Sequence, residues 1–148
     1  MREDKMATSL NERVVKLILP SMIGYERIAM SSLASFAAMY DFPSERVEDL
    51  KTVVAEAAIN AMQHGNKWRP DAEVRIGFHF FNDAIQILVT DEGEGIKELV
   101  PQPDIERIMK KLDPPVGFGI FLIRKLADEV EFNADTENGH CMKMVIKK

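Results

Sequence analysis

Residues 56–60 read Glu56-Ala57-Ala58-Ile59-Asn60, which places a carboxylate and a carboxamide four positions apart. They belong to a predicted helix over residues 44 to about 64, with Ser44 as the expected N-cap and Gly65 as the expected left-handed residue after the last turn. Side chains four apart on a helix are neighbours, so both can reach one point in space. An exposed, solvated pair explains this spacing equally well when the pair is taken alone.

The apolar side chains of this helix form one stripe that leaves the polar pair outside it. The stripe consists of Val47, Leu50, Val54, Ala57, Ala58 and Ala61. At ~100° per residue, Glu56 and Asn60 lie more than a quarter turn from the centre of the stripe. We therefore expect the stripe to pack on a sheet and the pair to face a groove. There a carboxamide oxygen can hold a hydrated Mg²⁺ while a carboxylate handles a proton.

A second polar segment, Asp91-Glu92-Gly93-Glu94-Gly95, follows a predicted strand. A plain acidic turn is one explanation. An EF-hand loop is excluded, because its sixth position is Ile96 and its twelfth is Gln102. A Rossmann phosphate loop is disfavoured, since a third glycine is missing and two glutamates would repel a pyrophosphate. The segment suits the base end of a nucleotide: Asp91 can accept from the exocyclic amine of adenine, and the glycines permit close approach.

A third segment, Gly117-Phe118-Gly119-Ile120, opens a predicted helix over residues 120–127. Backbone N–H groups at a helix start bind phosphate, and glycines let the phosphate come close. A flexible helix entry is the simpler explanation of the two glycines alone. The proline-rich residues 97–116 before it are predicted to form a mobile cover.

The remaining pattern predicts an α/β two-layer sandwich with helices on one face of a mixed, mostly antiparallel sheet. Another helix is expected over residues 25–40, where apolar side chains recur at helical spacing. The predicted strands are residues 12–19, 74–80, 84–90, 129–134 and 142–146. The 148 residues fit one domain over 11–148, preceded by a flexible N-terminus over 1–10.

Composition narrows the function classes. The net charge of -5 argues against a nucleic-acid partner, which requires a basic surface. No apolar run approaches the ~20 residues of a membrane helix, and no signal peptide is recognisable, so we expect a cytoplasmic protein without membrane contact. The single cysteine, Cys141, fits a reducing compartment. The histidines show no metal-ligand spacing, and His140 is expected to lie in the last turn without a functional role.

In this order and spacing, the three segments resemble the N, G1 and G2 boxes of the GHKL ATPase superfamily. More narrowly, residues 56–66, 90–96 and 117–128 are similar to the bacterial anti-sigma factor serine kinases. The resemblance covers nearly the whole chain. It implies a Bergerat-type ATP-binding fold in a single histidine-kinase-like ATPase domain.

The resemblance also implies roles for individual residues. Asn60 would ligate the Mg²⁺ that bridges the ATP phosphates, and Asp91 would hold the adenine amine. Glu56 matches the general base of the family, which accepts the proton of a serine hydroxyl. The other residues implied to contact the nucleotide are His64, Gly65, Gly93, Gly95, Ile96, Gly117, Phe118, Gly119 and Ile120.

Partners follow from the same resemblance. Such kinases phosphorylate an anti-anti-sigma protein, sequester a sigma factor and usually form homodimers. Arg27 matches a position at the partner surface of the family, although a solvated arginine is an equal explanation. Two departures are Pro114-Pro115-Val116, where relatives tend to carry glycine or a basic residue, and Gly139-His140 in place of a frequent Gly-Thr.

Two other functions are consistent with the sequence. The first is a nucleotide-gated protein-binding module without kinase activity, against which Glu56 argues because a pure binder needs no base. The second is the catalytic domain of a sensor histidine kinase. It is disfavoured, because no room is expected upstream for a phosphoacceptor helical hairpin.

Overall fold

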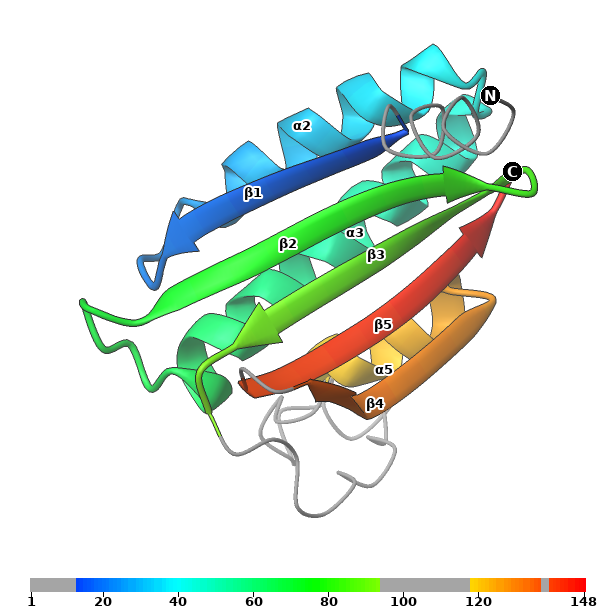
Figure 1. Cartoon of the computed structure of the whole chain (residues 1–148). Coiled ribbons are helices and arrows are strands. Elements are labelled where there is room, and N and C mark those ends of the chain that lie inside the picture. Colours follow the sequence, from blue (N-terminus) through cyan, green and yellow to red (C-terminus); the bar gives the residue numbers. More distant parts are fainter. Residues whose placement is uncertain (1–12, 94–117, 137–138) are drawn as a thin grey trace, which may run out of the picture.

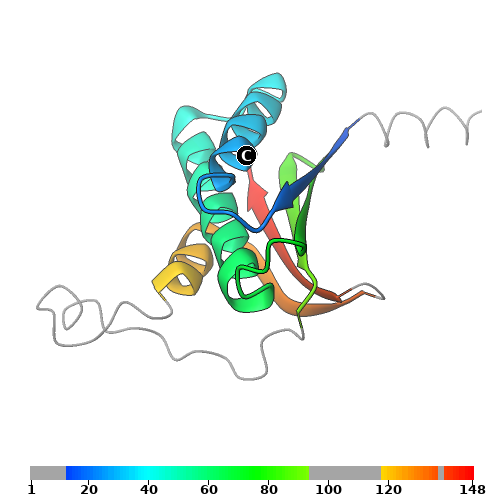
Figure 2. The same cartoon turned by 90° about the vertical axis from the view of Figure 1, so that its left-hand side faces the viewer.

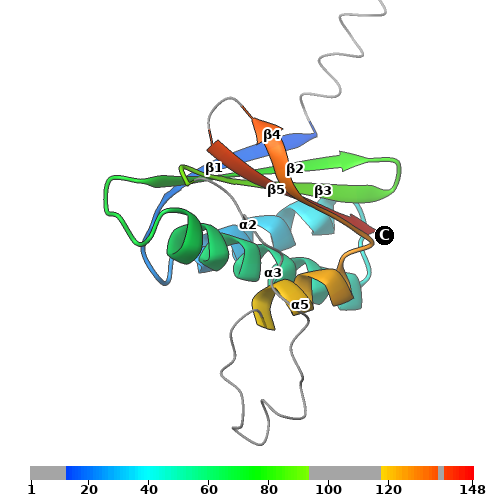
Figure 3. The ribbon, with the colours of Figure 1, turned by 90° about the horizontal axis from the view of Figure 1, so that it is seen from below.

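The computed structural model describes residues 13–93, 118–136 and 139–148 (Figure 1). They form two layers, a five-stranded sheet and a layer of helices that covers one of its faces (Figures 2 and 3). The strands are β1 (Val14–Pro20), β2 (Glu73–Phe81), β3 (Ala84–Asp91), β4 (Glu129–Thr136) and β5 (Gly139–Lys147). The helices are α2 (Glu26–Met39), α3 (Ser44–Asn60), the π-helix η1 (Ala61–Gly65) and α5 (Phe118–Leu126).

The strand order is β1-β2-β3-β5-β4, and every pairing among these described strands is antiparallel. The predicted sandwich with a mostly antiparallel sheet is therefore confirmed. β5 runs between β3 and the edge strand β4, so the last described strand lies in the interior of the sheet (Figure 1). This order places the end of β3 beside the beginning of β5, at the end of the sheet where the candidate site residues lie. In the described residues, no helix has the length and apolar character needed to cross a membrane.

The β2–β3 hairpin follows the alternating pattern of its sequence. Asn82 and Asp83 have φ values of 51° and 55°, as a two-residue type I′ connection requires. The alternate residues facing the helices are buried; they are Val74, Ile76, Phe78, Ile85, Ile87 and Val89. The predicted hairpin and its register are therefore confirmed.

The predicted apolar stripe of α3 is confirmed, except that Val47 is only partly buried and that Val53, which the prediction did not include, is buried. Its buried residues are Leu50, Val53, Val54, Ala57 and Ala58, continued by Ala61 in η1. This face packs on the sheet and on the neighbouring helices α2 and α5. Glu56 and Asn60 lie outside the stripe and are only partly buried, as expected.

The predicted N-cap of α3 is wrong by one residue. Ser44 is the first helical residue, and Pro43 is the N-cap, without a side-chain capping bond. The Pro43 carbonyl accepts the first helical hydrogen bond, from the Val47 N–H at 3.0 Å. Pro43 has the extended conformation of an N-cap (φ -60°, ψ 149°). The chain therefore enters the helix in the required direction without a capping bond from the Ser44 side chain.

The predicted left-handed glycine at the end of this helix is wrong as well. Gly65 lies within η1, where the Asn66 N–H bonds the Ala61 carbonyl at 2.8 Å, five residues back. The positive φ values come later, at Lys67 (52°) and Trp68 (56°). Gly65 therefore serves a purpose other than backbone conformation.

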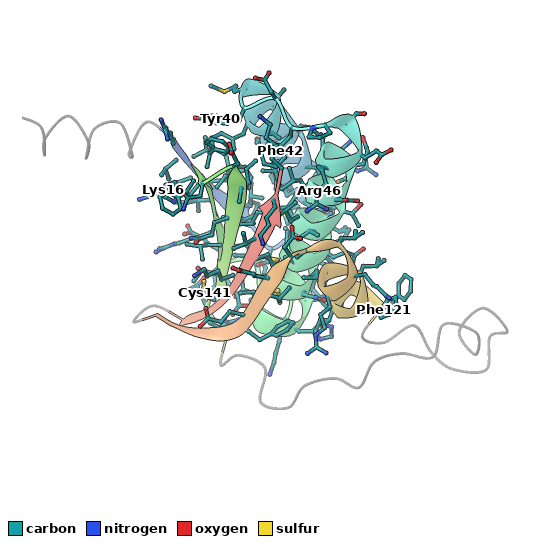
Figure 4. The ribbon with its side chains drawn as sticks, turned by 90° about the vertical axis from the view of Figure 1, so that its right-hand side faces the viewer. Lys16, Tyr40, Phe42, Arg46, Phe121 and Cys141 are labelled. Carbon is teal, nitrogen blue, oxygen red and sulfur yellow. The ribbon has the colours of Figure 1, made fainter. Side chains whose placement is uncertain are left out.

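Arg46 ties the other end of α3 to the C-terminal elements (Figure 4). Its guanidinium donates to Asp128 Oδ2 at 2.6 Å, to the Lys147 carbonyl at 2.9 Å and to Asp49 Oδ2 at 2.9 Å. One arginine thus connects the start of α3 with Asp128, two residues after the end of α5, and with the end of β5.

Candidate nucleotide-binding site

The first turn of α5 lies against the polar face of α3. A Cβ atom on Gly119 would lie 2.6 Å from Glu56 Oε2 and 3.7 Å from Asn60 Nδ2. A Cβ atom at this position would require the Glu56 carboxylate to move, so glycine permits the closest approach of the two helices. The structure therefore brings Glu56, Asn60 and Gly119 together.

Glu56 is partly buried in this contact. Burial raises the pKa of the Glu56 carboxyl, because desolvation favours the neutral form. A carboxylate with a raised pKa is a better proton acceptor near neutral pH than an ordinary surface glutamate. The environment thus fits a general base.

Asn60 has an unpaired amide group at the same place. Its Nδ2 atom is buried and has no hydrogen-bond partner within the described part of the chain. A buried amide donor without an acceptor costs about 1–3 kcal/mol. A bound phosphate oxygen would supply that acceptor, while the carboxamide oxygen is a suitable ligand for Mg²⁺. The donor set therefore fits a phosphate and its metal ion.

Asp91 ends β3 and is only 3% exposed. Gly65 lies directly on it, because a Cβ atom there would collide with the Asp91 carboxylate. Gly93 lies equally close to Gly65, whose carbonyl oxygen would collide with a Cβ atom on Gly93. Asp91 Oδ1 also accepts a hydrogen bond from the Gly93 N–H at 2.8 Å. The end of η1 and the loop after β3 are thus in direct contact.

Asn66 holds this loop from behind and is fully buried. Its Oδ1 accepts from the Glu92 N–H at 2.8 Å, and its Nδ2 donates to Ser21 Oγ at 2.9 Å and to the Glu73 carbonyl at 3.0 Å. The amide is therefore satisfied on both sides and fixes the backbone after Asp91. The motif alone does not predict the burial of Asn66, since that burial depends on contacts with Ser21, Glu73 and Glu92.

His140 lies beside Asp91, which corrects the expectation that it occupies a turn. It is the second residue of β5, directly opposite Asp91 in the antiparallel pairing, and only 9% of it is exposed. Its Nδ1 is 3.1 Å from Asp91 Oδ2. The departure from Gly-Thr therefore places an imidazole against the carboxylate. Only the strand register reveals this contact, and no local pattern in the sequence encodes it.

The other predicted residues take varied positions. His64 is exposed on η1. Phe118 is partly buried and stacks on Phe121, with ring centroids 5.9 Å apart, whereas Ile120 is buried at the start of α5. Other predicted site residues and the predicted cover lie outside the described residues; they are Gly95, Ile96, Gly117 and residues 97–116.

The described site therefore has two ends. Glu56, Asn60 and Gly119 form the first, and Gly65 with Asp91 forms the second. Residues 56–65 of α3 and η1 run from one end to the other. A ligand with a base at one end and phosphates at the other matches this division.

Comparison with known proteins identifies the family. Residues 19–146 match the histidine kinase-like ATPase domain. The chain belongs to this family. It is 33% identical over 134 residues to the serine-protein kinase RsbW of Oceanobacillus iheyensis, an alignment that covers 83% of this chain and 80% of that protein.

Two further comparisons agree with this assignment. The anti-sigma F factor of Clostridium beijerinckii is 32% identical over 131 residues, covering 83% of this chain and 85% of that protein. A crystal structure of the RsbU and RsbW domains of a Mycobacterium tuberculosis protein matches with a TM-score of 0.64 at 13% identity. The match covers 90% of this chain and 31% of that longer chain, and it confirms the fold.

Proposed function

We propose that this chain is an ATP-dependent protein serine kinase that also acts as an anti-sigma factor. The observation that carries the proposal is the packing of Gly119 against Glu56 and Asn60, which joins a base, an amide and a helix start at one point. The names of the relatives, serine-protein kinase RsbW and anti-sigma F factor, support the same function.

The base of ATP is assigned to the second end of the site. Asp91 is a buried carboxylate whose oxygens each retain a lone pair after the bonds from Gly93 and His140. An exocyclic amine is the donor that such a group accepts, and adenine carries one at its Watson–Crick edge. Gly65 and Gly93 let the end of η1 and the loop after β3 pack closely around this carboxylate, since a Cβ atom on either glycine would collide with its neighbour.

The phosphates and Mg²⁺ are assigned to the first end. Asn60 would hold the metal ion through Oδ1, with Nδ2 donating to a phosphate oxygen. When bound, Mg²⁺ offsets the negative charge of the phosphate oxygens. Gly119 keeps the start of α5 close enough for its backbone N–H groups to contribute.

Glu56 is the proposed general base. It accepts the proton of a serine hydroxyl while the serine oxygen bonds the γ-phosphorus and the bond from that phosphorus to the leaving ADP oxygen breaks. The raised pKa of Glu56 supports this role, because proton transfer is most efficient when the base titrates near the working pH.

The proposed protein partners are an anti-anti-sigma protein, as the phosphorylated substrate, and a sigma factor. Arg27 at the start of α2 is exposed and would contact them. Four residues close to Arg27 in the sequence have exposed apolar side chains that a bound partner would bury; they are Met22, Ile23, Tyr25 and Ile28. A homodimer, a single domain over residues 11–148 and a cytoplasmic location complete the proposal.

The test is a phosphotransfer assay. The purified chain is incubated with Mg²⁺-ATP and the anti-anti-sigma protein from the same organism, and mass spectrometry identifies the modified residue. Phosphoserine that disappears in the Glu56→Gln variant and with a chelator is the expected result. If no phosphoserine forms while ATP still controls partner binding, the chain is a nucleotide-gated binding module instead.

A further inference from the structure

The contact between His140 and Asp91 is built into the sheet. The two residues are directly opposite each other on β5 and β3, and both side chains are more than nine-tenths buried. Their polar atoms, Nδ1 and Oδ2, are 3.1 Å apart. A buried pair at this distance is a specific hydrogen bond, because neither group can turn to water instead.

The chemistry of the carboxylate fixes which ring nitrogen carries the proton. An ionised carboxylate only accepts hydrogen bonds, so Nδ1 must be the donor. In the neutral ring, Nε2 is then the acceptor, and it is buried without a partner within the described residues. A free imidazole in water does not favour the proton on Nδ1. Finding the proton on Nδ1 of His140 therefore reports directly on the contact with Asp91.

His140 supplies a second hydrogen-bond donor that restricts the orientation of the Asp91 carboxylate, in addition to the packing of Gly65 against it. The Gly93 N–H holds Oδ1 alone, and rotation about the terminal torsion of an aspartate is soft. Donation from His140 to Oδ2 fixes the carboxylate plane. Each oxygen then keeps a lone pair in a defined direction.

We propose that His140 is a positioning residue for base recognition: it orients the Asp91 carboxylate toward the exocyclic amine of an adenine. The inference rests on the proposed function, because it presumes that Asp91 reads the base. His140 thereby controls the preference for adenine over guanine nucleotides and leaves the phosphate end unchanged.

Two substitutions of His140 distinguish the effect of losing the hydrogen bond to Asp91 from the effect of losing the imidazole ring. In His140→Asn, the amide nitrogen takes the place of Nδ1 and can still donate to Asp91. In His140→Gln, the longer side chain carries its amide toward the position of Nε2 and leaves Asp91 without the donor. We expect His140→Asn to keep the ATP dissociation constant within about threefold, and His140→Gln to raise it about tenfold or more.

The readout distinguishes positioning from a loss of structure. In His140→Gln, the ratio of the GTP to the ATP dissociation constant falls, while binding of Mg²⁺-tripolyphosphate and the rate at saturating ATP are unchanged. A merely structural role would weaken all three ligands together. Equal ATP affinity and base preference in His140→Gln and the wild type would overturn the inference.

A measurement on the unmodified chain tests the same point. Long-range ¹H–¹⁵N spectra distinguish the two neutral tautomers from the charged ring, and the neutral His140 ring should be protonated at Nδ1. The protein has three histidines, and the signal missing from His140→Gln assigns the ring. Protonation at Nε2 would contradict the inference without reliance on any variant's affinity.

Asp91→Asn separates this inference from the proposed function. The NH₂ group of the new amide would face the N–H of Gly93 or of His140, where Asp91 has an accepting oxygen. ATP binding should therefore be lost. A wild type that does not bind ATP overturns both proposals. If the wild type binds, Asp91→Asn does not and His140→Gln binds normally, only the role of His140 is wrong.

Discussion

Gly65 and Asp91 are in such close contact that a Cβ atom on the glycine would collide with the carboxylate. The contact joins the end of η1 to the end of β3 and leaves Asp91 only 3% exposed. Gly65 is therefore required by its neighbour and not by its own backbone conformation.

Alanine at Gly65 should displace the Asp91 carboxylate and weaken ATP binding at least tenfold, because forcing a methyl group into a packed contact costs about 1–3 kcal/mol. Gly77→Ala is the matched control, since its Cβ atom would be 4.0 Å from the nearest neighbouring atom. Calorimetric titration with ATP measures the difference. Equal affinities for the two variants would show that Gly65 does not position Asp91.

Asn60→Ala should remove the Mg²⁺ dependence of ATP binding, while adenosine still binds weakly. The substitution removes the proposed metal ligand and the buried donor, but leaves Asp91 and its surroundings intact. We expect the affinity for Mg²⁺-ATP to fall by about a hundredfold. The ATP titration is repeated with and without Mg²⁺.

Gln63→Ala provides the control for Asn60→Ala. Gln63 is exposed on the next turn, and its substitution removes an amide of similar chemistry. It should bind Mg²⁺-ATP as the wild type does. A dependence on Mg²⁺ that survives in Asn60→Ala would refute the metal assignment.

The sequence predicts the parts of this molecule that local patterns encode. The stripe around Leu50 and Val54 follows from helical spacing, and the hairpin at Asn82 follows from strand alternation with a turn signal. Glu56 and Asn60 lie off the stripe for the same reason. These features need only neighbours within a few residues.

Other features depend on contacts between distant segments. The π-helix at residues 61–65 is not marked by any local signal, and it moves the left-handed residues to Lys67 and Trp68. His140 reaches Asp91 only because β5 pairs with β3 in one register. Asn66 is buried because Ser21 and Glu92 converge on it. Tertiary structure, not propensity, decides all of these.

Glu56→Gln should retain ATP binding and lose phosphotransfer. The amide is the same size as the carboxylate but cannot accept the serine proton, and general-base catalysis contributes about 10²–10⁴-fold. Single-turnover phosphorylation with saturating ATP measures the loss, and an ATP titration confirms binding within about twofold of the wild type. Undiminished transfer would remove Glu56 from the mechanism.

The same substitution should change stability in a pH-dependent way. Burial raises the pKa of Glu56, so between the ordinary carboxyl pKa and the raised one the folded chain binds more protons than the unfolded chain. Stability therefore falls as the pH rises through this window. Above the raised pKa, Glu56→Gln should be the more stable protein, and below the ordinary pKa the gain should vanish.

Thermal unfolding at a series of pH values measures this difference. Glu48→Gln, at an exposed glutamate on the same helix, separates the effect of burial from the loss of one negative charge. A stability gain for Glu56→Gln that is the same at every pH would contradict the assigned cause.

Arg46→Met should destabilise the fold without affecting the nucleotide site. Methionine preserves much of the apolar stem, but the bonds to Asp128 and the Lys147 carbonyl are lost, and these connect α3 to the ends of α5 and β5. Hydrogen bonds to charged groups contribute about 1.5–3 kcal/mol each, less for a partly exposed pair, so we expect a net loss of about 1–3 kcal/mol in urea unfolding. Lys51→Met is the control, because its 3.4 Å contact joins an exposed glutamate within one helix and should contribute under about 0.5 kcal/mol. Equal unfolding midpoints for the two variants would show that Arg46 does not hold the C-terminal elements to α3.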